Sequence, residues 1–238
     1  MFLLKNSTRR EIKFKVFIKD VGKLYSWILK SSFKKSFSNR GVNSLYYDTP
    51  NLDFANENII GLSKRIKIRA RWYSNNDKNF LIEFCKQKQV FKFEVKRKLN
   101  NQSDKIILSE FKSDNENLIT ERRNLLKKKL KLEISNYSDL SHIELNDIVF
   151  VGYNREYYEN FYDPNIRLTI DKDIVCSKCN NLNDLKITKI SNNYIIIELK
   201  FDQQKEDLIK NMMNTFPFRQ VRSSKYLYAL SKYHRFSY

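Results

Sequence analysis

Hydrophobic and polar residues alternate through the segment IKIRARWY, Ile66 to Tyr73, as strictly as anywhere in the chain. A period of two predicts a β-strand, because successive side chains of a strand point to opposite faces. One face then carries Lys67, Arg69, Arg71 and Tyr73, and the other face carries only apolar residues. Three cations in a row suit a solubilising surface as well as a binding site, so this strand alone does not decide between the two.

The same alternation returns in several other segments and predicts a protein built mainly of two-faced strands. In each of them charged or hydroxyl side chains share one face, and those faces hold Glu11, Lys13 and Lys15; Glu94, Lys96 and Lys98; Tyr153, Arg155 and Tyr157; Arg167, Thr169 and Asp171; and Glu198 and Lys200. Residues 42–47, 80–87 and 104–111 are further expected strands, and the last of these contains Lys105. Residues 34–40 are expected to form a basic loop.

Helical periodicity is confined to residues 20–31, 114–132, 206–214 and 224–234. Asp20 is suited to cap the first of these helices, and Ser223 or Ser224 the last. The predicted fold class is therefore α+β. The strands could form a sandwich with charges outside, or a closed antiparallel β-barrel with charges inside and helices packed on the outer apolar face. Tyr and Thr side chains among the cations favour the barrel, and residues 1–238 are expected to form one domain.

The excess of basic residues indicates which classes of binding partner to expect. The 238 residues include 45 Lys and Arg against 27 Asp and Glu, which gives a net charge of +18. Such an excess favours nucleic acid, anionic lipid or a polyanionic small molecule as partner. The aromatic residues form no recognisable stacking platform, so nucleic acid is not the expected partner. No apolar run approaches 18 residues and no signal-peptide pattern is present, so we expect no transmembrane segment and a cytoplasmic location.

Cys176 and Cys179 form a CxxC motif, which in some proteins belongs to a metal or redox site. A structural zinc site needs four ligands, and the two histidines, His142 and His234, lack a matching spacing. Ordinary thiols in a reducing compartment are therefore the expectation.

A barrel lined by cations requires an anion, because two unit charges about 6 Å apart repel by roughly 3 kcal/mol at an effective dielectric of about 20. Arg and Lys around a narrow channel suit several phosphates in a row better than one carboxylate. Glu198 is either neutralised by Lys200 or holds a divalent metal that bridges phosphate oxygens. Lys225 falls in the first turn of the last helix, where the helix dipole disfavours a cation, so it is either solvated or held by a bound anion.

Eight fragments, taken in order over nearly the whole chain, resemble the VTC (vacuolar transporter chaperone) polyphosphate polymerase domain of the CYTH and triphosphate tunnel metalloenzyme superfamily. They are EIKF from Glu11, VNSLYYDTP from Val42, KIRARWY from Lys67, FEVKRK from Phe93, YNREYY from Tyr153, IRLTID from Ile166, IELK from Ile197 and SSKY from Ser223. The resemblance implies an antiparallel tunnel that binds triphosphate or polyphosphate. It also implies a reaction that transfers the terminal phosphoryl of ATP to a growing phosphate chain, with Mn²⁺ or Mg²⁺ as cofactor.

The resemblance further implies a role for individual residues. The catalytic phosphate ligands would be Lys13, Arg69, Arg71, Arg155, Arg167, Lys200 and Lys225. Substrate binding would add Glu11, Lys96, Lys98, Lys105, Tyr153 and Ser224, and Glu198 would hold the metal.

Two departures from the family pattern bear on function. Related triphosphatases carry ExExK in the first strand, where this chain has Arg9, Glu11 and Lys13. The missing first carboxylate weakens the hydrolase interpretation without excluding it. The second departure is the extra strand-like segment at residues 80–87, whose Glu83 and Cys85 are alternatives for the places assigned to Glu94 and Lys96.

The expected function is thus a soluble, metal-dependent polyphosphate polymerase. A triphosphatase on the same barrel is the alternative enzyme, because water in place of the phosphate acceptor turns the same site into a hydrolase. A non-catalytic polyphosphate-binding protein, or an RNA-binding protein that uses its basic surface, is the alternative from another class. Eukaryotic members of the family are tied to membrane segments, so a separate membrane partner stays open.

Overall fold

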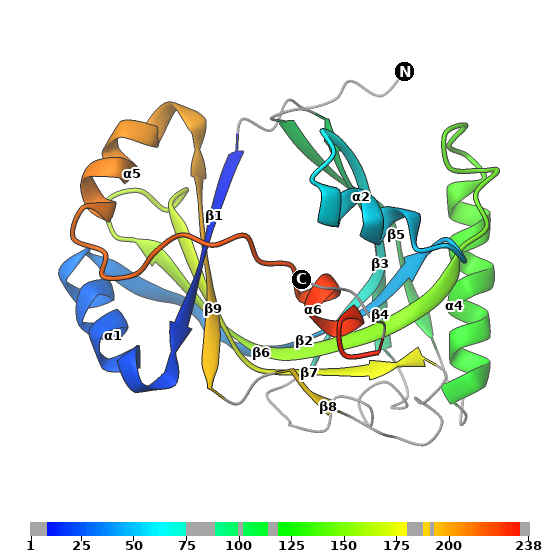
Figure 1. Ribbon diagram of the computed structural model, residues 1–238, viewed down its shortest axis with the longest axis horizontal. Coiled ribbons are helices and arrows are strands. Elements are labelled where there is room, and N and C mark those ends of the chain that lie inside the picture. Colours follow the sequence, from blue (N-terminus) through cyan, green and yellow to red (C-terminus); the bar gives the residue numbers. More distant parts are fainter. Residues whose placement is uncertain are drawn as a thin grey trace.

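One antiparallel sheet connects most of the chain in the computed structural model (Figure 1). The structure describes residues 9–74, 89–99, 102–113, 119–179, 188–190 and 193–233. The strands are β1 (Arg9–Phe17), β2 (Phe33–Asp48), β3 (Lys64–Ser74), β4 (Gln89–Leu99), β5 (Gln102–Ser113), β6 (Asn146–Asn160), β7 (Arg167–Lys178), β8 (Thr188–Lys189) and β9 (Tyr194–Asp202). Their order in the sheet is β1-β9-β7-β6-β2-β3-β4-β5, and β8 pairs with β7.

The sheet curves strongly, so that β1 and β9 face β3, β4 and β5 across an open interior (Figure 1). The predicted antiparallel α+β fold is confirmed, but a barrel closed by hydrogen bonds is not. Within the described ranges no ladder joins β1 to β5, the two ends of the strand order. Side chains bridge this gap instead, because Lys96 Nζ on β4 lies 3.6 Å from Glu11 Oε2 on β1.

The helices are η1 (Ile18–Asp20), α1 (Val21–Lys30), α2 (Asp53–Ile60), α4 (Ile119–Ile134), η3 (Gln203–Lys205), α5 (Glu206–Met213) and α6 (Lys225–Leu230). Of the four predicted helices, the first and third match α1 and α5 closely. The last is shorter than predicted, and the second is described only from Ile119 onward. Asp20 precedes α1, but its carboxylate accepts a hydrogen bond from Lys23 Nζ and caps no backbone N–H.

One local prediction is wrong, and one helix was not predicted. Residues 34–40, expected to be a loop, belong to β2 and pair with β6, but irregularities of register after Lys35 and Phe37 disrupt the alternation there. Residues 53–60, for which no helix was predicted, form α2. The Asp48 carboxylate explains this helix, since it accepts hydrogen bonds from the backbone N–H groups of Phe54 and Ala55 at the helix start.

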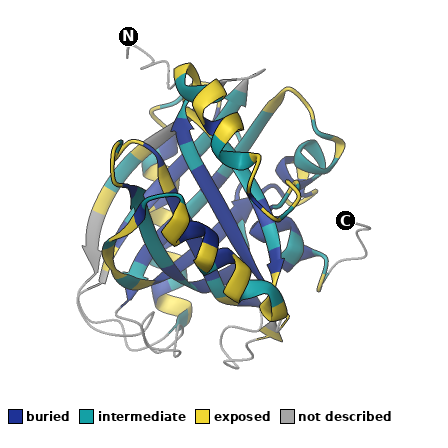
Figure 2. Cartoon of the chain, turned by 90° about the vertical axis from the view of Figure 1, so that its left-hand side faces the viewer, coloured by how far each residue is buried: buried dark blue, intermediate teal, exposed yellow. Residues whose placement is uncertain are grey.

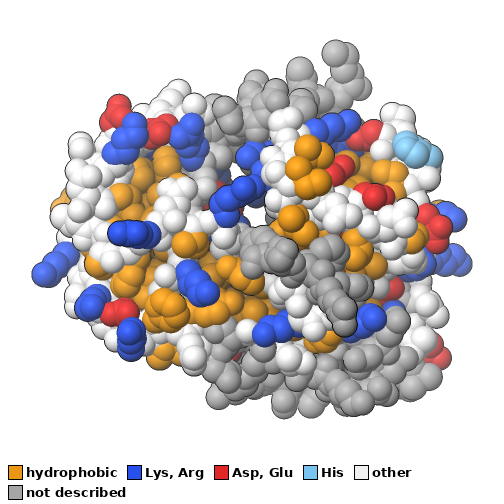
Figure 3. All heavy atoms as spheres, in the orientation of Figure 1, with side chains coloured by type: hydrophobic (Ala, Val, Ile, Leu, Met, Phe, Trp, Pro, Cys, Tyr) orange, Lys and Arg blue, Asp and Glu red, His pale blue; other side chains and the backbone are white. Residues whose placement is uncertain are grey.

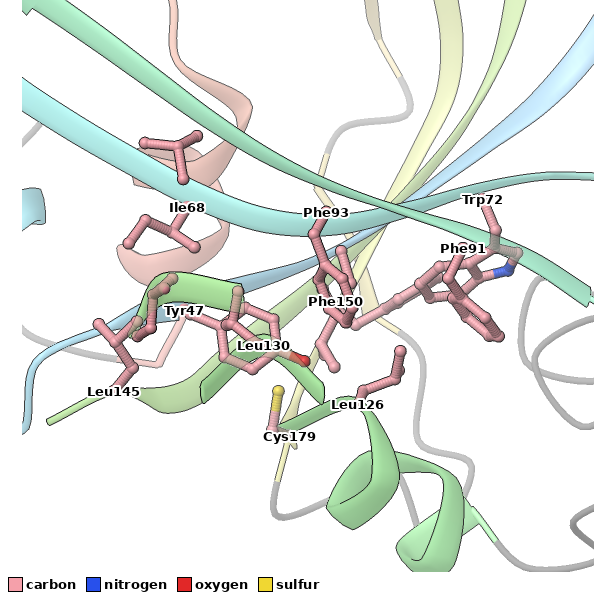
Figure 4. Packing of buried hydrophobic residues seen from close by; sticks show 14 of the residues in the cluster. Tyr47, Ile68, Trp72, Phe91, Phe93, Leu126, Leu130, Leu145, Phe150 and Cys179 are labelled. Carbon is pink, nitrogen blue, oxygen red and sulfur yellow. The ribbon is translucent and has the colours of Figure 1, made fainter. Parts of the chain in front are cut away.

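Two hydrophobic clusters cover the outer face of the sheet. The first lies between α4 and strands β3, β4 and β6, where Trp72 is fully buried and packs near Phe91 and Phe150, with Leu126 and Leu130 of α4 on the other side (Figure 4). The packing of α4 over this strand face agrees with the expectation that helices cover the outer apolar face. The second cluster joins α1 and α5 to strands β1, β7 and β9. Figure 2 shows exposed residues on the outward side of the helices and buried residues along the strands.

A third cluster lies on the inner face, which corrects the expectation that all helices pack outside. Tyr226, Leu227 and Leu230 of α6 pack there against Val151 and Tyr153 of β6. The short helix therefore fills part of the concave side, between the two arms of the sheet (Figure 1). Its first residue lies at the boundary between this apolar filling and the charged part of the interior.

The two cysteines of the CxxC motif belong to different hydrophobic clusters. Cys176 belongs to the inner cluster with α6, and Cys179 to the outer cluster with α4. Burial raises the pKa of both thiols. These surroundings are those of ordinary core cysteines. Over the described ranges, no helix is both long enough and apolar enough to cross a membrane.

Candidate phosphate-binding site

Four cations from four separate elements converge on the carboxylate of Glu198 on β9. Lys225 of α6 approaches to 2.9 Å and Arg155 of β6 to 3.2 Å, while Lys200 of β9 lies 3.4 Å away and Lys13 of β1 3.8 Å away. Glu198 is buried, which by itself raises the pKa of a carboxyl group. The cations outweigh this burial and hold the pKa of Glu198 well below its ordinary value. The carboxylate is therefore ionised at neutral pH.

Asp171 on β7 is a second centre of the same network. Its two oxygens form a bidentate pair with Arg155, at 2.5 Å from Nε and 2.7 Å from Nη2, and Lys225 Nζ lies 2.5 Å from Oδ2. Burial opposes the charge on Arg155 and Lys225, yet these carboxylates raise the pKa of both. A cation in the first turn of α6 is thus stabilised by Asp171 and Glu198, which offset the unfavourable helix dipole without any bound anion.

Glu94 on β4 neutralises part of the basic face of β3. Its Oε2 lies 2.6 Å from both Nε and Nη2 of Arg69 and 3.7 Å from Nη1 of Arg71. Arg71 also donates to Ser44 Oγ and Tyr153 Oη, each at 3.4 Å. Because the two guanidinium groups are held by neighbouring strands, both point into the interior in fixed positions.

Glu11 on β1 is surrounded by three lysines. Its carboxylate lies 3.0 Å from Lys13, 3.6 Å from Lys96 and 3.8 Å from Lys200. Burial and the neighbouring Glu198 raise the pKa of Glu11, but these lysines more than offset both effects and lower it. Glu11 and Glu198 therefore share Lys13 and Lys200 and lie in one continuous ion network.

Lys67 on β3 lies at the edge of this network. Its Nζ donates to Ser224 Oγ at 3.2 Å and lies 5.5 Å from the centre of the Tyr46 ring. Burial lowers the pKa of Lys67 to about 7, with Tyr46 opposing and the cations Lys13, Arg69 and others adding to the shift. Burial would raise the pKa of Tyr46, but Arg69, Lys67 and other cations lower it to about 7. Lys67 and Tyr46 therefore each shift the pKa of the other.

The interior face carries more positive than negative charge. The described side chains that make it up are the cations Lys13, Lys67, Arg69, Arg71, Lys96, Arg155, Lys200 and Lys225 and the carboxylates Glu11, Glu94, Asp171 and Glu198. Cations thus outnumber carboxylates two to one, so the interior attracts an anion of several charges.

The interior opens to solvent through a cavity of about 780 Å³. Its walls come from β1, β3, β4, α2 and residues 220–224, and they include Lys13, Lys67, Lys96 and Lys98. Figure 3 shows this hollow on one face of the molecule, with Lys and Arg side chains at its edge. An anion therefore has a route from solvent to the ion network.

Most of the residues predicted for the site lie together. Those in contact through the network described above are Glu11, Lys13, Arg69, Arg71, Lys96, Tyr153, Arg155, Glu198, Lys200, Ser224 and Lys225. Lys98 lies at the cavity mouth. Arg167 pairs with Lys200 in the ladder, but it is exposed and donates to the Pro164 carbonyl oxygen at 3.4 Å.

The strand register also bears on the alternatives at residues 80–87. β4 pairs with β3 so that Glu94 lies opposite Arg69, and Lys96 opposite Lys67. Glu94 and Lys96 thus occupy the places assigned to them, while Glu83 and Cys85 lie outside the described residues. Lys105 lies opposite Lys96 in the ladder between β4 and β5, and the structure describes only its backbone.

Three charged interior residues were given no role in the site from the sequence. Alternation already placed Asp171 and Glu94 on the polar faces, and Lys67 beside Arg69. The missing signal is the pairing between strands, since only the register shows that each carboxylate faces an arginine.

The fold and the site define a protein in which a curved antiparallel sheet surrounds a basic interior that is open to solvent. The chain belongs to the VTC domain family, because the family model "VTC domain" matches residues 8–234. No curated protein sequence matches the chain significantly.

Two solved structures are similar to this chain. A protein from Vibrio parahaemolyticus, described as a proposed adenylate cyclase, has a TM-score of 0.51 and 11% identity over 94% of this chain and 97% of its own. A proposed adenylyl cyclase from Hippeastrum, described as having a dominant triphosphatase activity, has a TM-score of 0.47 and 14% identity over 94% of this chain and 96% of its own. The likeness to the first structure concerns the fold alone.

Proposed function

We propose that the protein is a metal-dependent polyphosphate polymerase that transfers the terminal phosphoryl of ATP to the end of a phosphate chain. The observation that carries the proposal is the convergence of Lys13, Arg155, Lys200 and Lys225 on Glu198 inside the sheet of a VTC-family protein. Guanidinium and ammonium groups held in fixed positions in a buried site suit the charge of a transferring phosphoryl group.

In the proposed reaction an oxygen of the terminal phosphate attacks the γ-phosphorus of ATP. The bond between the γ-phosphorus and the β,γ-bridging oxygen breaks, ADP leaves, and the chain becomes one phosphate longer. Arg69, Arg155 and Lys200 approach the interior from β3, β6 and β9, and in the proposed complex they would contact phosphates from different sides. Their role is to position the reactants and to neutralise charge, which supplies most of the catalysis in phosphoryl transfer.

Glu11 and Glu198 are the residues that would hold Mn²⁺ or Mg²⁺. Carboxylate oxygens suit these hard ions, and Mg²⁺ is usually bound by one or two carboxylates together with substrate phosphates. Among the described residues no group of three or more His, Cys, Asp or Glu forms a ready metal cage. The donor set therefore fits an ion that binds together with the phosphate chain, and such an ion would neutralise phosphate charge.

The products of ATP turnover test this proposal. Incubation with ATP and Mn²⁺ should yield ADP together with chains that resolve as polyphosphate on a gel. Glu198→Gln should abolish this turnover while tripolyphosphate binding persists. The matched control is Glu206→Gln, which removes a carboxylate of α5 from a partly exposed ion pair with Arg10. Release of orthophosphate alone would refute the polymerase and leave the triphosphatase.

A triphosphatase is the second candidate, because the same ion network serves when water replaces the chain end as acceptor. Arg9 in place of the first carboxylate of ExExK counts against it. Binding of tripolyphosphate with neither polymer nor orthophosphate formed from ATP would instead favour a non-catalytic polyphosphate-binding protein.

A further inference from the structure

Arg65, Lys98 and Arg222 form a basic cluster at the mouth of the cavity, outside the ion network. Arg65 on β3 pairs directly with Lys98 on β4 across the ladder, and Arg222 lies in the segment that leads to α6. The Arg222 guanidinium lies over Gly61, where a Cβ would approach Nη2 to 2.9 Å. All three line the same cavity as Lys67 and Lys96.

Most of the deeper cations pair with a carboxylate, whereas the described residues place no carboxylate beside this mouth cluster. Each of Lys13, Arg69 and Arg155 pairs with a glutamate or an aspartate. Within the described part of the chain, by contrast, none of the three mouth cations forms an ion pair. Burial lowers the pKa of Arg65 and Lys98, and their cationic neighbours lower it further. A like-charged pair across a ladder is destabilising, so this arrangement suits an added anion.

We propose that Arg65, Lys98 and Arg222 form a separate polyanion subsite that binds phosphates of a long chain beyond those held by the ion network. The inference rests on the proposed function and names its substrate class as long polyphosphate. Along β3, Arg65 lies four residues from Arg69, which is about 13 Å at roughly 3.3 Å per residue. A chain that contacts Arg69 in the interior and continues to the mouth therefore needs more phosphates than a triphosphate held at Arg69 alone.

The test compares two anions on one set of variants. The triple variant Arg65→Gln, Lys98→Gln, Arg222→Gln removes the mouth cluster, and Lys128→Gln, Lys129→Gln, Lys131→Gln removes the same charge from the exposed side of α4. Affinities for tripolyphosphate and for a polyphosphate of about a hundred phosphates are measured by calorimetry, and circular dichroism checks that each variant folds.

The mouth variant should bind the long chain at least about tenfold more weakly, a change of about 1.4 kcal/mol, and bind tripolyphosphate within about twofold of the wild type. The α4 variant should match the wild type for both anions. An unchanged long-chain affinity in the mouth variant, or an equal loss in the α4 variant, would overturn the subsite and leave the polymerase proposal standing. If the wild type binds neither anion, the proposed function fails first and the subsite with it.

Discussion

Replacing Glu198 by Gln should destabilise the ligand-free protein, because it removes the negative charge on which four cations converge. Each pair at about 3 Å interacts by roughly 5 kcal/mol at an effective dielectric of about 20, and desolvation of the charges offsets much of this. Removing one partner of a buried ion pair costs about 3–5 kcal/mol. Asp171 and Glu11 continue to neutralise Lys225 and Lys13, so we expect the low end, about 3 kcal/mol.

For a protein of this size such a loss lowers the melting temperature by about 6–12 °C. Thermal denaturation followed by circular dichroism, at low salt and with a metal chelator, measures it directly. Glu206→Gln breaks the surface pair with Arg10 at 2.7 Å, which is worth about 1 kcal/mol or less, so this control should melt within about 4 °C of the wild type.

Tripolyphosphate should restore part of the loss, since its phosphates replace the missing negative charge. Its stabilising shift without metal should therefore be larger in Glu198→Gln than in the wild type. The role assigned to Glu198 is refuted if Glu198→Gln has the same melting temperature as the wild type. It is also refuted if tripolyphosphate raises the melting temperature of Glu198→Gln less than that of the wild type.

Three further predictions concern the remaining interior groups. Arg69→Ala and Arg71→Ala should each weaken tripolyphosphate binding by about tenfold or more in calorimetry, and unchanged affinity in both would remove them from the site. Lys67 has a pKa of about 7, and a bound phosphate would raise that pKa, so binding of tripolyphosphate near pH 8 should take up protons. Calorimetry detects this uptake as a binding heat that depends on the buffer, and the dependence should shrink in Lys67→Met. A binding heat that is the same in all buffers would contradict this. Glu11 and Glu198 have folded-state pKa values below the ordinary 4.5, so they stabilise the fold above that pH and lose this contribution as the pH falls. The melting temperature below pH 4.5 should therefore fall more steeply with pH in the wild type than in Glu11→Gln. Parallel curves for the two proteins would contradict the proposed ion network.

Alternation predicts which side chains share one face of a strand. The polar faces of β1, β3, β6 and β9 follow from a period of two, because one buried face fixes where all the other side chains of a strand point. The amphipathic pattern of α1 worked for the same reason, since Leu24 and Ile28 are buried. Lys13, Arg69, Arg155 and Lys200 lie on these polar faces and meet in the interior although they are far apart in sequence. That these faces point inward, and not outward as in a sandwich, does not follow from alternation.

Features that depend on contacts between distant segments could not be predicted in this way. Helix α2 starts where the Asp48 carboxylate accepts hydrogen bonds from backbone N–H groups. The same carboxylate accepts a hydrogen bond from the Tyr226 hydroxyl of α6 at 2.6 Å. That contact also helps to hold α6 inside the sheet, whereas its apolar residues alone are equally compatible with an outer face. The pairing of Arg155 with Asp171 requires the register of β6 on β7, which no local pattern contains.

Closure of the sheet lies between these cases. Charged inner faces predict a closed interior, yet they do not specify how its edges meet. Lys96 and Glu11 join the two arms by an ion pair, which polyphosphate could exchange for its own contacts. The sequence therefore predicts which residues line the interior better than it predicts how the two ends of the sheet meet.

We propose that the concave face, and not the basic outer surface, binds the phosphate chain. A crystal structure of the protein with tripolyphosphate and Mn²⁺ distinguishes the two surfaces. We expect phosphates within hydrogen-bonding distance of Arg69, Arg155 and Lys200, with the ion at Glu198. Tripolyphosphate bound only to outer lysines such as those of α4, with the ion network around Glu198 intact and without phosphate, would contradict it.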